Sequence, residues 1–130
     1  MLLKIIFGFF IGLFLGYILE FFYRSITHKK IIIPKLVNSQ MYAFTGVFLF
    51  FLYPLKLSLF LELVLIFLFP TIIEFITGYL YLKIKHKYLW DYSKELFNFQ
   101  KLICLRFSFY WFIISLIFFY LIIPFIYPLL

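Results

Sequence analysis

The sequence predicts an all-α polytopic membrane protein with four transmembrane helices and a short amphipathic interfacial helix before the last. Composition and chain length lead to this prediction. The 130 residues are 67% hydrophobic and 13% charged, whereas a soluble domain is about 45–50% apolar and roughly 25% charged. A chain this short leaves much of its surface exposed, so that surface must face lipid. We therefore expect residues 1–130 to form a single transmembrane domain.

The first span is expected over residues 5–23, where Lys4 precedes an apolar run that lacks a signal-peptide cleavage pattern. Gly8, Gly12 and Gly16 recur every four residues, which places them on one helix face. Two overlapping small-xxx-small motifs let a second helix approach closely within lipid. We expect close packing on this stripe, against another helix of the chain or against a second copy.

Three further spans are expected at residues 41–53, 57–82 and 105–123. Two polar loops separate them, at residues 24–40 and 83–104. As one helix, Met41 to Leu82 would be about 60 Å long, twice the hydrocarbon thickness. The chain must therefore turn, and Pro54 marks the turn. The second span stays short unless Asn38–Gln40 join it. Pro70 is expected to kink the third helix, and Pro124 to end the fourth.

Basic residues are distributed unevenly between the two ends of the four predicted spans. Two of them, Lys4 and Lys56, fall at one end, and ten fall at the other: Arg24, Lys29, Lys30, Lys35, Lys83, Lys85, Lys87, Lys94, Lys101 and Arg106. By the positive-inside rule, both polar loops face the cytoplasm and both termini face out. The expected location is the bacterial inner (plasma) membrane.

Three charged residues within or directly beside the spans are candidates for a polar site. Glu74 lies nine residues before Lys83, and an ionisable group at that depth is costly unless it is paired, neutralised or hydrated. It is either part of a substrate or proton path or a structural glutamate that faces another helix. Glu20 and Arg24, one helical turn apart, either form an interfacial ion pair or line a cytoplasm-facing cleft with Glu74.

The longest polar segment is residues 89–98, and it contains Trp90, Asp91, Tyr92, Ser93 and Asn98. Its tryptophan and tyrosine suit an interfacial aromatic belt. Asp91 or Ser93 could cap a short helix over Lys94–Leu102 that lies along the membrane surface. The segment is thus an interfacial elbow between spans or a docking surface for a cytoplasmic partner.

Several classes of function are disfavoured. The single cysteine, Cys104, allows no intrachain disulfide. His28 and His86 lie beside lysines, and no cluster has the spacing of metal ligands. A Gly-rich phosphate loop is absent, and we expect no enzyme activity, no cofactor and no nucleic-acid partner. The expected partners are the lipid bilayer and further subunits in a homo- or hetero-oligomer.

Several motifs occur in the order found in a known family. Tyr23-Arg24 follows the first glutamate, and a small residue follows Glu74 by four. Trp90-Asp91-Tyr92-Ser93 stands sixteen residues after Glu74, followed by Phe97-Asn98 and Ile103-Cys104-Leu105. In these residues the chain resembles the bacterial integral membrane family labelled type IV ABC-transporter permeases (CmpB-like). The resemblance implies a permease subunit that works with a separate ATPase.

The chain also departs from the family pattern. The first loop lacks the Asn-Arg-Gly motif, and only Gln40-Met41-Tyr42-Ala43-Phe44 echoes the stretch after it. Lys101-Leu102 replaces Gly-Arg, and Leu82 replaces a second glutamate. The resemblance adds Tyr42 to Glu20, Arg24 and Glu74 as a candidate substrate site.

Three functions follow from the sequence. The first is a small transporter permease subunit with a cytoplasm-facing polar site. The second is a non-transport assembly or accessory subunit that binds a partner through its glycine-striped helix. The third is a small oligomeric ion channel.

Overall fold

The computed structural model describes all residues, Met1–Leu130, and the chain forms a bundle of four long helices. The membrane-spanning segments are Leu2–His28, Leu36–Leu55, Leu59–Lys85 and Leu105–Leu129, each long and apolar enough to cross a membrane. Large hydrophobic side chains lie exposed along the whole outer surface of the bundle. Such a surface suits lipid rather than water, so the all-α, four-span prediction is confirmed.

The first two helices, α1 (Leu2–His28) and α2 (Leu36–Leu52), form an antiparallel hairpin. The glycine stripe of α1 is buried against α2. A Cβ on Gly12 would lie 2.5 Å from the carbonyl oxygen of Tyr42, and a Cβ on Gly46 the same distance from that of Gly8. The stripe therefore packs against a helix of the same chain, and backbone contact replaces side-chain contact there.

The second helix begins at Leu36, before the predicted start at residue 41. Asn38 and Ser39 lie inside this helix, buried, and Gln40 Nε2 donates a hydrogen bond to Thr77 Oγ1 over 2.8 Å. These residues, predicted to lie in the first polar loop, therefore belong to the second helix, and Gln40 links it to the third. The turn at Pro54 forms as η1 (Tyr53–Leu55), with Lys56 in the left-handed region at φ 52°.

The third helix, α3 (Leu59–Lys85), begins at an N-cap on Ser58, whose side-chain oxygen accepts a hydrogen bond from the backbone N–H of Leu61. It continues through Pro70 to Lys85. The last span consists of α4 (Leu105–Ile117), the π-helical turn η2 (Phe118–Ile122), α5 (Ile123–Ile126) and η3 (Tyr127–Leu129).

The last span extends past its predicted end. The π-helical turn places Pro124 in the first turn of α5. A proline is tolerated there because no intrahelical partner is needed for its missing N–H. The chain therefore remains helical to Leu129.

The prediction of a short amphipathic helix over Lys94–Leu102 is wrong. The segment forms turns and a two-stranded antiparallel hairpin, β1 (Asn98–Phe99) and β2 (Ile103–Cys104). Phe97, Gln100 and Lys101 have positive φ angles, which a right-handed helix excludes. Trp90 Nε1 donates to the carbonyl oxygen of Leu102 over 2.7 Å, and a surface helix would carry Leu102 away from that contact.

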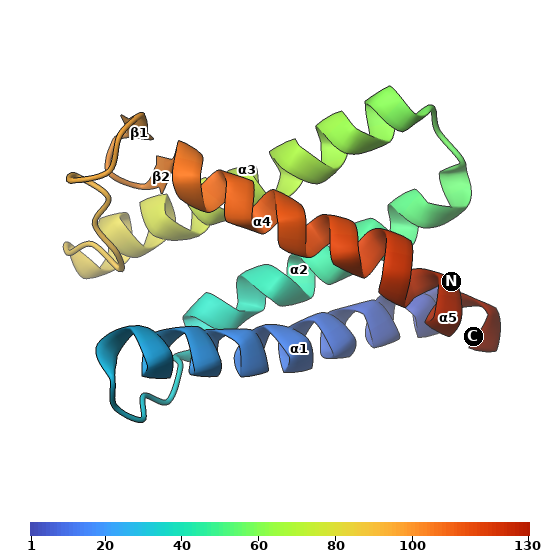
Figure 1. Cartoon of the computed structure of the whole chain (residues 1–130), viewed down its shortest axis with the longest axis horizontal. Coiled ribbons are helices and arrows are strands. Elements are labelled where there is room, and N and C mark those ends of the chain that lie inside the picture. The colour runs from blue at the N-terminus through green and yellow to red at the C-terminus, as the bar shows by residue number, and fades with distance from the viewer.

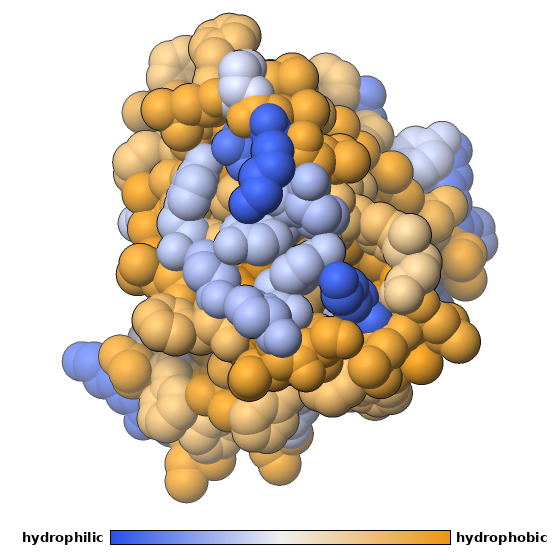
Figure 2. Space-filling view, turned by 90° about the vertical axis from the view of Figure 1, so that its right-hand side faces the viewer, coloured by the Kyte–Doolittle hydropathy of each residue, from blue (hydrophilic) through white to orange (hydrophobic).

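The two ends of the bundle differ. The loop end, defined here as the end that carries residues 29–35 and 86–104, lies opposite both termini and the turn at η1 (Figure 1). At the terminal end, Lys4 Nζ lies 3.8 Å from the ring centroid of Tyr127. Figure 2 faces this terminal end and shows a small hydrophilic patch surrounded by hydrophobic atoms.

Candidate functional site

A pocket of about 350 Å³ opens near the loop end of the bundle. All four long helices and the loop that precedes α4 contribute to its wall. Its lining residues are Leu19, Glu20, Tyr23, Arg24, His28, Asn38, Met41, Tyr42, Glu74, Trp90, Tyr92, Phe107, Tyr110, Trp111 and Ile114. We call it the loop-end pocket. It brings together all four residues of the predicted polar site and two residues of the polar segment 89–98.

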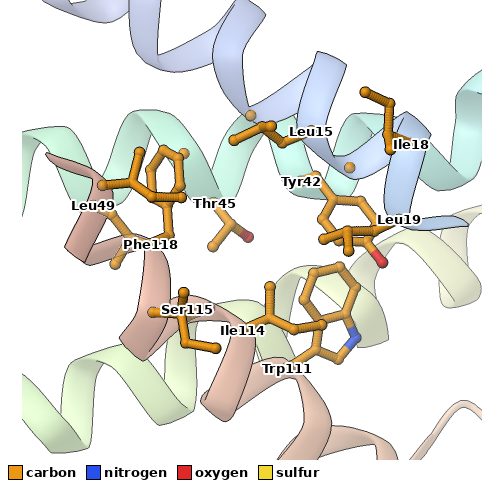
Figure 3. Close-up of a pocket in the computed structure, with 15 residues that line it drawn as sticks. Leu15, Ile18, Leu19, Tyr42, Thr45, Leu49, Trp111, Ile114, Ser115 and Phe118 are labelled. Carbon is orange, nitrogen blue, oxygen red and sulfur yellow. The ribbon is translucent and has the colours of Figure 1, made fainter. Parts of the chain in front are cut away.

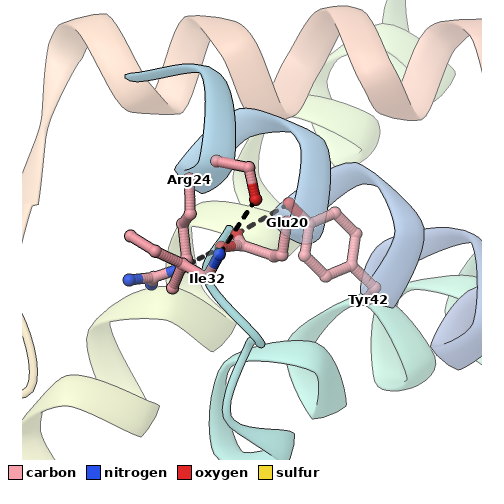
Figure 4. A network of polar contacts seen from close by, with 5 residues as sticks. Glu20, Arg24, Ile32 and Tyr42 are labelled. Atoms are coloured by element: carbon pink, nitrogen blue, oxygen red, sulfur yellow. Dashed lines mark hydrogen bonds and ion pairs between the residues drawn. The ribbon is translucent and has the colours of Figure 1, made fainter. Parts of the chain in front are cut away.

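One wall of the pocket carries a closed network of polar contacts. Arg24 Nε donates to Glu20 Oε2 over 2.8 Å, and Tyr42 Oη donates to Glu20 Oε1 over 3.0 Å. Figure 4 shows Glu20 between these two partners. Both oxygens of this carboxylate therefore have a donor, and its charge is balanced by the guanidinium.

Tyr42 reaches Glu20 because α1 offers no side chain beneath its ring. A Cβ on Gly16 would overlap the ring of Tyr42. Glycine at this position lets the tyrosine ring lie flat against the backbone of α1, one turn from Glu20. The glycine stripe thus positions a pocket side chain as well as packing two helices.

The opposite wall carries the second carboxylate. Glu74, on α3, is 1% exposed. Tyr92 Oη donates to Glu74 Oε1 over 2.7 Å, whereas Glu74 Oε2 has no hydrogen-bond partner. Neither ion pair of the protein includes Glu74, since one joins Glu20 to Arg24 and the other joins Glu95 to Arg106. Glu74 is therefore a buried acid with spare acceptor capacity and no cationic partner.

The loop before α4 is held over Glu74 by close packing. A Cβ on Gly78, one turn along α3, would lie 3.1 Å from both Leu102 Cδ2 and Trp90 Cζ2. The rings of Trp90 and Tyr92 stack with centroids 6.2 Å apart, and Tyr92 stacks on Phe107 at 4.9 Å. This packing fixes the tyrosine hydroxyl at the carboxylate.

Tyr92 remains a hydrogen-bond donor to Glu74. Burial raises the pKa of the Tyr92 phenol above its ordinary value of 10.0, and the charge of Glu74 and the hydrogen bond between them raise it further. All three effects disfavour the phenolate.

The remaining members of the polar segment shape the loop and do not line the pocket. The backbone N–H of Ser93 donates to Asp91 Oδ1 over 2.9 Å, and this hydrogen bond lowers the pKa of the exposed Asp91 carboxyl. Asn98 Oδ1 accepts from the backbone N–H of Lys101 over 3.2 Å within the hairpin turn. Asp91 therefore closes a local turn rather than capping a helix.

A second pocket, of about 290 Å³, lies farther from the loops between α1, α2 and the last span (Figure 3). We call it the inner pocket. Its wall is mainly apolar, with Leu15, Ile18, Leu49 and Phe118 among the lining residues.

The two pockets share four lining residues, namely Leu19, Tyr42, Trp111 and Ile114. The rings of Tyr42 and Trp111 have centroids 4.5 Å apart, and Figure 3 shows them side by side at one end of the inner pocket. The polar loop-end pocket and the apolar inner pocket therefore meet at the rings of Tyr42 and Trp111.

Sequence reasoning did not select several aromatic residues that line the loop-end pocket: Tyr23, Phe107, Tyr110 and Trp111. Each lies within or beside a run of apolar residues, where an aromatic side chain gives no sign of which helix face it occupies. His28 also lines the pocket. No three His, Cys, Asp or Glu side chains converge anywhere in the structure in a way that would hold a metal ion.

The sequence model of the family described as "Putative ABC-transporter type IV" matches residues 7–130. The chain belongs to this family. The match covers both walls of the loop-end pocket and confirms the resemblance drawn from the motifs. Comparison with curated proteins and with solved structures finds no match.

Proposed function

We propose that the protein is a membrane-embedded permease subunit of an ATP-driven transporter, and that the loop-end pocket is its substrate site. Family membership supports the transporter assignment. The observation that carries the site is Glu74, whose buried carboxylate keeps an unpartnered oxygen at the pocket wall. An ionisable group held at this depth without a full set of partners is typical of a transport path rather than of packing.

The loop end is proposed to face the cytoplasm, and both termini to face outward. Ten of the twelve lysines and arginines lie at or beside the loop end, and the positive-inside rule assigns such an end to the cytoplasm. The 130 residues contain no P-loop motif, and we assign ATP hydrolysis to a partner ATPase. That ATPase would dock on the two basic loops at this end.

The accessory-subunit alternative depends on a free glycine stripe. In the structure Gly8, Gly12 and Gly16 are covered by α2 of the same chain, so they offer no surface to a partner. The same contact removes the support that the stripe lent to an oligomeric ion channel. The permease assignment is therefore the one that the geometry favours.

Two experiments test this proposal. Affinity purification of the detergent-solubilised protein should recover an ATPase, and proteoliposomes that contain both chains should show ATP-dependent flux. Recovery of no ATPase, together with no flux, would overturn the assignment.

Topology is tested by labelling a Ser93→Cys variant, since Ser93 is exposed and the native Cys104 is buried. A membrane-impermeant maleimide should label position 93 only after the cells are opened. Labelling of intact cells would place the loop end outside.

A further inference from the structure

We propose that the loop-end pocket binds an organic cation that bears an apolar group, with Glu74 as the counter-charge. The inference names a substrate class for the proposed permease and so rests on that function. The structure supports it through the aromatic lining of the pocket, its charge balance, and the adjoining inner pocket.

Aromatic side chains make up nearly half of the pocket lining. They come from α1, α2, α4 and the preceding loop, and comprise Tyr23, Tyr42, Trp90, Tyr92, Phe107, Tyr110 and Trp111. Cations are attracted to the negative faces of such rings. The Arg106 guanidinium already lies over two of them, 5.1 Å from the ring centroid of Phe107 and 5.8 Å from that of Tyr110. The remaining rings come from several elements and favour a weakly hydrated, ammonium-type group.

The two carboxylates and the one guanidinium that line the pocket sum in favour of a cation. Glu20 and Arg24 neutralise each other at 2.8 Å. Glu74 has no cationic partner, and the same buried side chain keeps Oε2 without a hydrogen bond. Its field acts through a medium of low dielectric, where a charge attracts its counter-ion far more strongly than in water.

An anionic ligand fits this arrangement poorly. The guanidinium of Arg24 already donates to Glu20, so an anion would compete with that carboxylate. The same anion would also approach Glu74, whose wall supplies no positive charge. The one guanidinium of the pocket is already paired, and Glu74 opposes the approach of a negative charge.

The inner pocket accounts for the apolar part of the ligand. It adjoins the loop-end pocket at Tyr42 and Trp111 and adds about 290 Å³ of mainly apolar space. Leu19 and Ile114 line both pockets and place apolar side chains at their boundary, against which a hydrocarbon or aryl group of the ligand would lie. Burial of that group adds to the affinity through the hydrophobic effect.

The chain contains a built-in reporter for this test. Its two tryptophans, Trp90 and Trp111, both line the loop-end pocket. Titration of the protein in a non-ionic detergent with benzyltrimethylammonium should therefore give a saturable change in tryptophan fluorescence. Benzyl alcohol, which is neutral, and benzenesulfonate, which is anionic, should give none over the same concentration range. Saturable binding of benzenesulfonate alone would overturn the proposal.

Glu74→Gln removes the charge and keeps the shape of the side chain. We expect it to weaken benzyltrimethylammonium binding at least about tenfold, a loss of roughly 1.4 kcal/mol. Glu62→Gln is the matched control, because Glu62 lies in the first turn of the same helix and does not line the pocket. The affinity of the Glu62→Gln variant for benzyltrimethylammonium should stay at the wild-type value. Equal affinity in both variants would contradict the proposal.

A second variant keeps the test valid if Glu74→Gln folds poorly. Tyr23 is exposed at the pocket rim, so Tyr23→Leu removes one aromatic face without opening the core. It should weaken benzyltrimethylammonium binding about threefold or more, while Tyr23→Phe keeps the wild-type affinity. Unchanged binding in Tyr23→Leu would count against an aromatic cation site.

Binding and transport fail separately. The fluorescence titration needs no ATPase, so saturable cation binding without ATP-dependent flux would leave this inference standing and overturn the permease function. Flux of a neutral or anionic solute without cation binding would do the opposite.

Discussion

The two walls of the loop-end pocket are built on a similar plan, and one residue makes their charge balance differ. On the α1–α2 wall, Gly16 seats Tyr42, which donates to Glu20. On the opposite wall, Gly78 seats Trp90, and the neighbouring Tyr92 donates to Glu74.

The differing residue is Arg24, which pairs with Glu20 and has no counterpart beside Glu74. The first wall is thereby electrically closed, and the second carries an acid with no cation beside it. We therefore propose that one acid stabilises the fold while the other is available to a ligand.

The largest effect is expected where the two walls rely on glycine. Gly16→Leu places a side chain into the ring of Tyr42, and overpacking of this kind costs about 1–3 kcal/mol or more. Gly8→Ala is the graded control, because its Cβ would lie 3.1 Å from the ring of Phe50 and 3.3 Å from the backbone oxygen of Gly46, which are tight contacts rather than an overlap. Thermal unfolding in detergent should show a large drop in melting temperature for Gly16→Leu and a small drop for Gly8→Ala. A reversed order would mean that α1 and α2 are not held by this contact.

The tyrosine hydroxyls should differ in their contribution to stability. Tyr92→Phe leaves the buried Glu74 without any hydrogen bond, a loss of about 1–3 kcal/mol. Tyr42→Phe leaves Glu20 still bonded to Arg24 and should cost at most about 1 kcal/mol. Chemical denaturation of the two variants would measure the difference in their free energies of unfolding. Equal losses would mean that Glu20 and Glu74 depend equally on their tyrosine hydrogen bonds, contrary to the contacts described.

Neutralising the two acids should change stability in opposite directions. Glu20→Gln leaves a partly exposed guanidinium unpaired and should lower the free energy of unfolding by up to about 1 kcal/mol. Glu74→Gln removes a costly buried charge and retains a carbonyl that accepts from Tyr92, so stability should hold or rise. The melting temperatures of both variants test this, and a large loss in Glu74→Gln would identify that residue as structural.

Alkaline pH should loosen the loop over the second wall. Because the pKa of Tyr92 is raised in the folded state, its contribution to stability is complete below about pH 10 and is lost as the pH rises above that value. At about pH 10.5 the loss is roughly 1 kcal/mol or less. Trp90 fluorescence in a Trp111→Phe background reports loop release, and Tyr92→Phe should lack this component of the titration.

The sequence predicted the features that depend on solvent and backbone. Hydropathy predicted four helices because lipid requires long apolar segments, and the spacing of Gly8, Gly12 and Gly16 predicted a close helix contact. The depth of Glu74 marked it as a costly charge before its surroundings were known. These inferences need only local pattern and the nature of the solvent.

The rest depended on tertiary contacts. The segment Lys94–Leu102 has a plausible helix start, yet the contact between Trp90 and Leu102 folds it into a hairpin. Asn38 and Gln40 were read as a loop signal because nothing local shows that Gln40 meets Thr77. Trp111 was missed since its pocket-facing side is set by the packing of α4.

The central claim is that the pocket owes its preference for a cation to the one unbalanced acid, and paired affinities for benzyltrimethylammonium test it most directly. Glu74→Gln removes that acid, whereas Arg24→Gln frees Glu20 to act as a second one. The account predicts that the first variant binds the cation at least about tenfold more weakly and the second binds it more tightly than the wild type. Weaker binding in Arg24→Gln, with unchanged binding in Glu74→Gln, would contradict it.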